Sequence, residues 1–137
     1  MKILIKRVYD PAAKSDGFRV LVDRLWPRGL SKTTAQIDLW LRDIGPSTTL
    51  RKWFHHDPVR WMEFIRRYHT ELKTKTVLLA TIKKQATIGP VTLLYSAKDV
   101  QHNHAVVLRN FLGTRSAARK PITRATKPAT FATRKNK

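Results

Sequence analysis

Runs of apolar residues predict three strands in this chain. Residues 2–9 alternate apolar and polar side chains and contain several β-branched residues, which predicts a first strand. Residues 18–25 and 91–97 are more continuously apolar, which is typical of strands buried on both faces of a parallel sheet. Turn-forming residues such as Asp10, Pro11 and Gly17 separate the first two strands.

The spacing of apolar residues between and after these strands predicts helices. Their expected ranges are 33–42, 47–54, 57–72, 75–86 and 102–112, the last closed by Gly113. Asp57 and Pro58 suit a helix start, because Asp caps the first turn and Pro fits the first helical position. The buried stripe of that helix consists of Trp61, Phe64, Ile65, Tyr68 and Leu72. The range 75–86 also has features of a strand.

This order of elements predicts an α/β fold. We expect a small three-layer domain over residues 1–113, with about three mostly parallel strands flanked by four to five helices. The order of the strands in the sheet does not follow from the pattern. The length of 137 residues and an apolar content of 42% suit one domain with a single core.

Several absences narrow the range of possible functions. No apolar run is long enough for a membrane-spanning helix, and Lys6 and Arg7 interrupt the apolar start of the chain, so we expect no signal peptide and a cytoplasmic location. Cysteine is absent, which excludes disulfides, thiolate catalysis and Cys-ligated metal centres. Nucleotide-binding glycine motifs and a paired-histidine zinc motif are also missing, so we expect no cofactor and no metal.

The positive charge is concentrated toward the C-terminus. The whole chain carries 28 basic and 9 acidic residues, a net charge of +19. Residues 114–137 contain eight of the basic residues, no acidic residue and few large apolar residues. We therefore expect a disordered basic tail, which can bind nucleic acid nonspecifically through its charge.

Charged and aromatic residues follow the two apolar strands. Asp23, Arg24, Trp26 and Arg28 come at the end of the second strand, and Lys98 and Asp99 follow the third. Ligands of open α/β sheets bind outside the carboxyl ends of the strands, and guanidinium groups match phosphates and carboxylates. The residues therefore predict an anion pocket, with an internal Arg–Asp pair that fixes the loops as the alternative.

Several sequence blocks resemble the YeaO-like branch of the domain-of-unknown-function 488 family. They are KRVYD (6–10), DGFRVLVDRLWPRGLSK (16–32), PSTTLRKWFHHDPVRW (46–61), VTLLYSAKD (91–99) and NHAVVL (103–108). The resemblance covers about residues 2–112 and leaves the tail outside the family pattern. It implies a small bacterial cytoplasmic α/β protein, and it implies no particular activity or catalytic residues.

Two interpretations from different classes follow. In the first, a strand-end pocket binds an anionic small molecule or nucleotide, with or without a reaction. Its ligand-binding candidates are Arg7, Arg24, Trp26, Arg28, Ser47, Arg51, Tyr95, Lys98 and Asn103, and its acid–base candidates are Asp23, Asp99 and His104. In the second, the basic surface and tail bind nucleic acid.

A third possibility is an interaction protein whose Arg–Asp cluster only stabilises loops. The sequence assigns no oligomeric state.

Removal of residues 114–137 tests the interpretation of the tail. We expect the melting temperature to stay nearly unchanged, because the tail contributes little to the core. Nonspecific DNA binding should weaken sharply, and the binding that the full chain shows should fall steeply with salt, as counterion release requires. Fluorescence anisotropy across a salt series measures both effects. A truncated chain that no longer folds would contradict the prediction.

Overall fold

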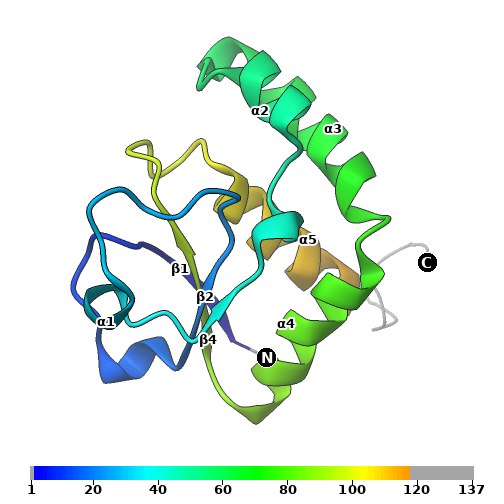
Figure 1. Ribbon diagram of the computed structural model, residues 1–137. Coiled ribbons are helices and arrows are strands. Elements are labelled where there is room, and N and C mark those ends of the chain that lie inside the picture. The colour runs from blue at the N-terminus through cyan, green and yellow to red at the C-terminus, as the bar shows by residue number, and fades with distance from the viewer. Residues whose placement is uncertain (1, 118–137) are drawn as a thin grey trace.

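A parallel β-sheet of four strands forms the centre of the fold (Figure 1). This computed structural model describes residues 2–117. Its strands are β1 (Ile3–Arg7), β2 (Phe18–Leu21), β3 (Leu39–Trp40) and β4 (Val91–Tyr95). Their order across the sheet is β1-β4-β2-β3, and each pair of neighbours is parallel. The predicted α/β class and parallel sheet are confirmed, with one strand more than we expected.

The strand that comes last in the sequence lies in the middle of the sheet. β4 pairs with β1 on one side and with β2 on the other, and Leu93 lies opposite both Ile5 and Val20. All five residues of β4 are buried. Because helices or loops cover both faces of a central parallel strand, its sequence is apolar without alternation.

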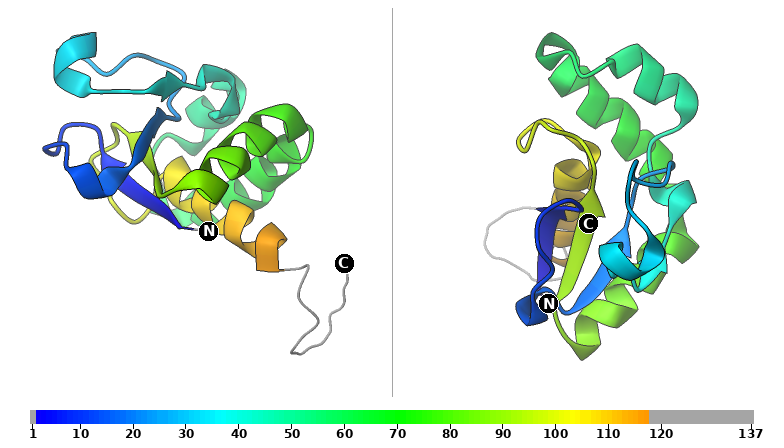
Figure 2. Two further views of the ribbon diagram at one scale, coloured as in Figure 1. Left: turned by 90° about the horizontal axis from the view of Figure 1, so that it is seen from below. Right: turned by 60° about the vertical axis from the view of Figure 1, so that its left-hand side comes forward.

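Helices cover the two faces of the sheet unequally. The helices are α1 (Lys32–Ala35), α2 (Thr48–Phe54), α3 (Trp61–Leu72), α4 (Thr76–Ile88) and α5 (His104–Ala117), with short 3-10 helices η1 (Lys14–Asp16), η2 (Arg42–Ile44) and η3 (Pro58–Arg60). Figure 2 shows the longer helices on one side of the sheet and α1 on the other.

Two clusters of buried side chains correspond to these two faces. Val20 and Leu93 point into the larger cluster, which contains residues from α2 to α5. Their neighbours Leu21 and Leu94 point to the opposite face, into a smaller cluster with Ala35 of α1. Successive side chains of a strand alternate between faces, so the domain has three layers, one of them thin.

Residues 33–42 do not form the predicted helix. The helix α1 ends at Ala35, and Gln36 adopts the left-handed conformation with φ of 50°. The chain then pairs with β2, because the Asp38 backbone N–H donates to the Arg19 carbonyl and the Asp38 carboxylate accepts from the Arg19 N–H. The indole of Trp40 donates to the carbonyl of Asp23 at 2.7 Å. These contacts with the edge of the sheet favour the short strand β3 over a helix.

The start of the predicted helix 57–72 is largely confirmed. The Asp57 side chain accepts a hydrogen bond from the Val59 N–H, and Pro58 begins the 3-10 turn that leads into α3. Phe64, Tyr68 and Leu72 are buried, as the stripe predicts, whereas Trp61 and Ile65 are only partly buried. The phenyl rings of Phe54 and Phe64 stack with centroids 4.4 Å apart, which joins α2 to α3.

The last helix is longer than predicted. α5 does not end at Gly113 but continues to Ala117, since one glycine costs a helix only about 1 kcal/mol relative to alanine. Buried Leu108 and Leu112 hold this part of the helix on the core. The predicted disorder of the basic tail concerns residues that lie, apart from 114–117, outside the described part of the chain.

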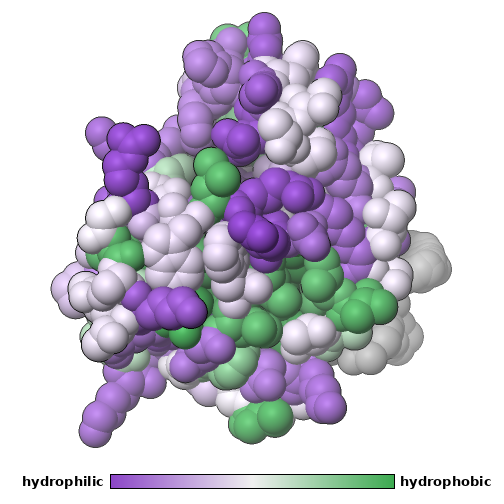
Figure 3. All heavy atoms as spheres, viewed as in Figure 1, coloured by the Kyte–Doolittle hydropathy of each residue, from purple (hydrophilic) through white to green (hydrophobic). Residues whose placement is uncertain are grey.

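The range 75–86 forms the helix α4 and not a strand. This helix buries Leu79, Ile82 and Ala86 but leaves Val77 and Ile88 largely exposed. Figure 3 accordingly shows apolar side chains gathered on the surface around α4. Among residues 2–117, no helix is both long and apolar enough to cross a membrane.

Phe64 provides a test of the core. Phe64→Ala should lower the free energy of unfolding by about 3–5 kcal/mol, because it removes a buried aromatic ring and leaves a cavity. Met62, two positions earlier in α3, is 76% exposed, so Met62→Ala should change stability by no more than about 0.5 kcal/mol. Urea denaturation measures both variants. A loss below about 1 kcal/mol for Phe64→Ala would contradict this assignment of the core.

Candidate functional site

The carboxyl ends of β2 and β4 are joined by a carboxylate. Asp23 follows β2, and Ser96 follows β4. The backbone N–H and the hydroxyl of Ser96 both donate to Oδ2 of Asp23, at 2.9 Å and 2.6 Å. The sequence analysis expected these two strand ends to supply one site, and the parallel pairing of β2 with β4 places them side by side.

His104, the first residue of α5, completes this junction. Its Nε2 lies 3.0 Å from the Val22 carbonyl oxygen and 3.1 Å from Oδ1 of Asp23. Both neighbours are acceptors, so Nε2 carries the proton, and Nδ1 of the neutral ring is the nitrogen that can accept one. The N–H is better aligned with the carbonyl, so Oδ1 has no hydrogen bond of good geometry within the described chain.

The environment keeps Asp23 ionised. Burial alone would raise the pKa of its carboxyl group. The contact with His104 and the hydrogen bonds from Ser96 outweigh burial and hold the pKa of Asp23 below its ordinary value. Oδ2 of this buried group is therefore matched by two donors of Ser96, and Oδ1 faces the imidazole of His104.

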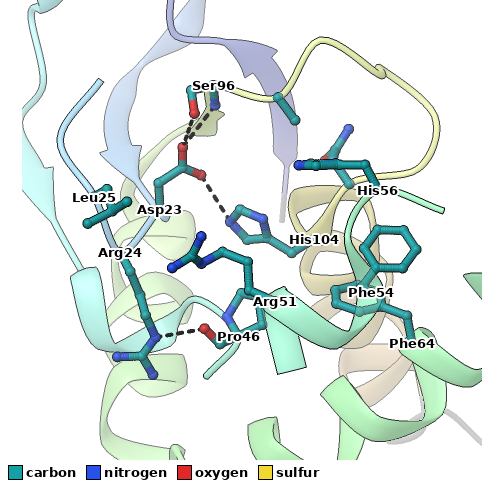
Figure 4. Close-up of a pocket in the computed structure, with 12 residues that line it drawn as sticks. Asp23, Arg24, Leu25, Pro46, Arg51, Phe54, His56, Phe64, Ser96 and His104 are labelled. Atoms are coloured by element: carbon teal, nitrogen blue, oxygen red, sulfur yellow. Dashed lines mark hydrogen bonds and ion pairs between the residues drawn. The ribbon is translucent and has the colours of Figure 1, made fainter. Parts of the chain in front are cut away.

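A cavity of about 190 Å³ opens beside this junction (Figure 4). One part of its wall is apolar and consists of Leu25, Pro46, Phe54, Phe64 and Ala97. The other part is polar and consists of Asp23, Arg24, Arg51, His56, Ser96, Asn103 and His104. The wall combines residues from the ends of β2 and β4 with residues from α2, α3 and α5.

The two arginines of the cavity differ in their freedom to bind a ligand. Nε of Arg24 donates to the Pro46 carbonyl at 2.7 Å, and its guanidinium lies 3.6 Å from the Asp43 carboxylate. Figure 4 shows this group turned away from His104. Arg51 projects from α2 toward Asp23 and His104. Its exposed side chain has no hydrogen bond or ion pair within residues 2–117.

Four of the predicted site residues form hydrogen bonds or pack within the nearby loops and helices. The buried amide of Asn103 donates to the Asp99 carbonyl and accepts from the Val106 N–H, which caps α5. The Asp99 carboxylate accepts from the backbone N–H groups of Gln101 and His102, and these bonds lower its pKa.

Ser47 caps α2, and its hydroxyl donates to Glu71 at 2.6 Å. Tyr95 is 3% exposed and lies in the larger core, and burial raises its pKa. Of the three acid–base candidates, Asp23 and His104 line the cavity, and Asp99 does not.

The remaining candidates lie around a second, neighbouring cavity of about 510 Å³. Arg7, Trp26, Arg28 and Lys98 belong to its wall. The structure thus divides the single predicted pocket into two. Phe54, His56 and Ser96 were not among the predicted ligand-binding or acid–base residues. Only Ser96 had a signal, since it directly follows a buried strand.

No group of three or more His, Asp or Glu side chains within the described residues is arranged to hold a metal ion. Within the described residues, the cavity offers the Arg51 guanidinium, the imidazole of His56, the imidazole of His104 beside a carboxylate, and an apolar wall.

Comparison with known proteins places the chain in a family. A family model described as an inactive subclade of DUF488-N3 matches residues 2–132. The chain belongs to this DUF488-N3i family. The uncharacterized protein YeaO of Escherichia coli (strain K12) is 50% identical over 115 residues, which cover 82% of this chain and 97% of the relative. The uncharacterized protein Rv3073c of Mycobacterium tuberculosis (strain ATCC 25618 / H37Rv) is 39% identical over 114 residues, 83% of this chain and 96% of the relative.

These matches confirm the resemblance to YeaO-like proteins. The match to the DUF488-N3i model continues past Gly113 to residue 132, so our expectation that the family pattern ends near residue 112 is wrong for this model. No solved structure matches the chain.

The Asp23 carboxylate gives a pH-dependent prediction. Asp23→Asn replaces the carboxylate with a neutral amide, which cannot match the existing donors equally well. The change should lower the free energy of unfolding by on the order of 1.5–3 kcal/mol at neutral pH, as for the loss of hydrogen bonds to charged groups. Because the folded pKa is lowered, the native carboxylate stabilises the fold above the pKa of an unfolded Asp, about 4. This contribution disappears as pH falls through the folded pKa.

The difference in unfolding free energy between the native chain and Asp23→Asn should therefore shrink below about pH 4. Urea denaturation at a series of pH values measures it. The matched control is Asp43→Asn, whose side chain is 74% exposed and should contribute little at any pH. An Asp23→Asn difference that is constant with pH would contradict the assignment.

Proposed function

We propose that this chain is a cytoplasmic protein that binds an anionic small molecule, with a phosphate-bearing nucleotide as the best fit, in the cavity beside Asp23 and His104. The observation that carries the proposal is the state of Arg51, which faces the cavity without a partner in the described chain. The only carboxylate in the wall, Asp23, already has its own donors. The cavity therefore has an excess of positive charge, and a guanidinium fork suits a phosphate.

The apolar part of the wall favours a ligand larger than inorganic phosphate. Phe54 and Leu25 lie on the same cavity as Arg51. Binding sites for small molecules commonly combine an apolar wall with a few placed polar groups. A nucleotide offers a flat base for the apolar wall and a phosphate for the polar groups.

Binding is favoured over catalysis. The Ser96 hydroxyl donates to Asp23, whose lowered pKa makes this carboxylate a weak base for activating a nucleophile. His104 has its protonated nitrogen turned toward Val22 and Asp23. The description of the matching family as an inactive subclade supports a role without turnover.

Nucleic-acid binding remains the second candidate because of the net charge of +19. The eight basic residues of 114–137 support it, and nearly all of them lie outside the described part of the chain. This candidate needs no cavity. The two functions can therefore be separated by variants of the cavity.

Adenosine monophosphate tests the proposed function by thermal shift. A ligand at ten times its Kd stabilises a protein by about 1.4 kcal/mol, which corresponds to a rise of roughly 3–11 °C in Tm for a domain of this size. Arg51→Ala should abolish this rise. Lys52→Ala removes the same charge from the next, exposed position of α2, outside the cavity wall, and should retain it. Equal shifts in both variants would overturn the proposal.

A further inference from the structure

The cavity beside His104 and the second cavity are neighbours that share two wall residues. Leu25 and Ser96 belong to the walls of both. Leu25 is 64% exposed, although it is a large apolar residue. Leu25 and Ser96 therefore mark where a ligand that reaches beyond the first cavity would meet the second.

The second cavity has its own free cations. Arg28 and Lys98 are exposed, and neither side chain has a hydrogen bond or ion pair within the described residues. No acidic residue belongs to the wall of this cavity. Arg7 is different, because its guanidinium donates to the carbonyls of Ala97 at 2.9 Å and Ser96 at 3.1 Å. Arg28 and Lys98 are thus the pair available to an anion.

The surface between the two groups of cations is apolar and aromatic. It includes Leu25, Trp26 and Pro27. The indole N–H of Trp26 donates to the Leu30 carbonyl at 2.6 Å, so the ring presents no free donor to a ligand. A flat or apolar group fits this stretch better than a third charge.

We propose that the two cavities together bind one elongated ligand with two phosphate groups. One phosphate contacts Arg51, the other contacts Arg28 and Lys98, and a nucleoside links them across Leu25. The inference rests on the proposed function and adds the second anionic group and its site. The chemistry is that of a nucleoside bisphosphate, which occurs as a free small molecule and as the repeating unit of a nucleic-acid strand.

One bivalent ligand is a better match than two separate ones. Once the first phosphate is bound, the second meets its site at a raised effective concentration if the nucleoside spans the shared wall at Leu25 and Ser96. Each phosphate then neutralises cations that the protein leaves unpaired. Two independent ligands would each lose translational freedom and would repel each other across the shared wall.

Calorimetric titration of the full chain with thymidine 3′,5′-bisphosphate and thymidine 5′-monophosphate tests this inference. The bisphosphate should bind about tenfold or more tightly than the monophosphate. The double variant Arg28→Ala/Lys98→Ala should remove this advantage and leave monophosphate binding intact. Lys32→Ala/Lys84→Ala removes two exposed charges away from both cavities, and this control should keep the advantage.

The results separate the two proposals. Equal affinities for bisphosphate and monophosphate, or a bisphosphate affinity that does not change in Arg28→Ala/Lys98→Ala, would overturn the two-phosphate site. The proposed function still stands in that case if Arg51→Ala abolishes monophosphate binding. It fails, and the further inference with it, if Arg51→Ala has no effect on either ligand.

A short oligothymidylate distinguishes the two sources of the ligand. A nucleic-acid strand is supported if the oligonucleotide binds more tightly than the bisphosphate. Its affinity should then fall more in Arg28→Ala/Lys98→Ala than in the Lys32→Ala/Lys84→Ala control. Equal affinities for the oligonucleotide and the bisphosphate support a free nucleoside bisphosphate. The paired controls matter because the basic tail adds the same nonspecific binding to every variant.

Discussion

The buried carboxylate of Asp23 is the constraint on which the site depends. It receives two hydrogen bonds from Ser96 and contacts the imidazole of His104. These three residues follow β2, follow β4 and begin α5, so one charged group ties together three segments that are far apart in the sequence. A buried charge is costly without partners, and the partners of Asp23 are those that also define one side of the cavity. The orientation of the cavity wall therefore follows from electrostatic satisfaction of this group.

The sheet was largely predictable because its strands are marked by long apolar runs. The run from Val91 to Tyr95 predicts a buried strand by itself, and the structure places it at the centre. The short strand β3 was not predictable. Its two residues, Leu39 and Trp40, carry no strand pattern, and their pairing depends on backbone contacts with Arg19 and on the indole bond to Asp23. Tertiary contacts of this kind override local helix propensity.

The general position of the site was predictable from the charges at the strand ends. Which of these charged side chains already have a partner in the protein was not predictable. Arg24 and Arg51 look equivalent in the sequence. In the structure, the first is held by Pro46 and Asp43, whereas the second has no partner in residues 2–117. Likewise, the side-chain amide of Asn103 forms its hydrogen bonds at the start of α5, with Asp99 and Val106. Which side chains remain available to a ligand depends on neighbours that only the folded chain brings together.

The central position of β4 has a consequence for the order in which the chain can fold. β1 and β2 do not pair with each other, and each has β4 as a neighbour. During synthesis, the first two strands emerge long before Val91, and until then β1 has no partner in the native sheet. Domains rich in such distant pairings fold slowly, and unpaired strands are prone to aggregation. A ribosome-bound chain of this protein therefore stays without its complete native sheet until most of the domain has been made.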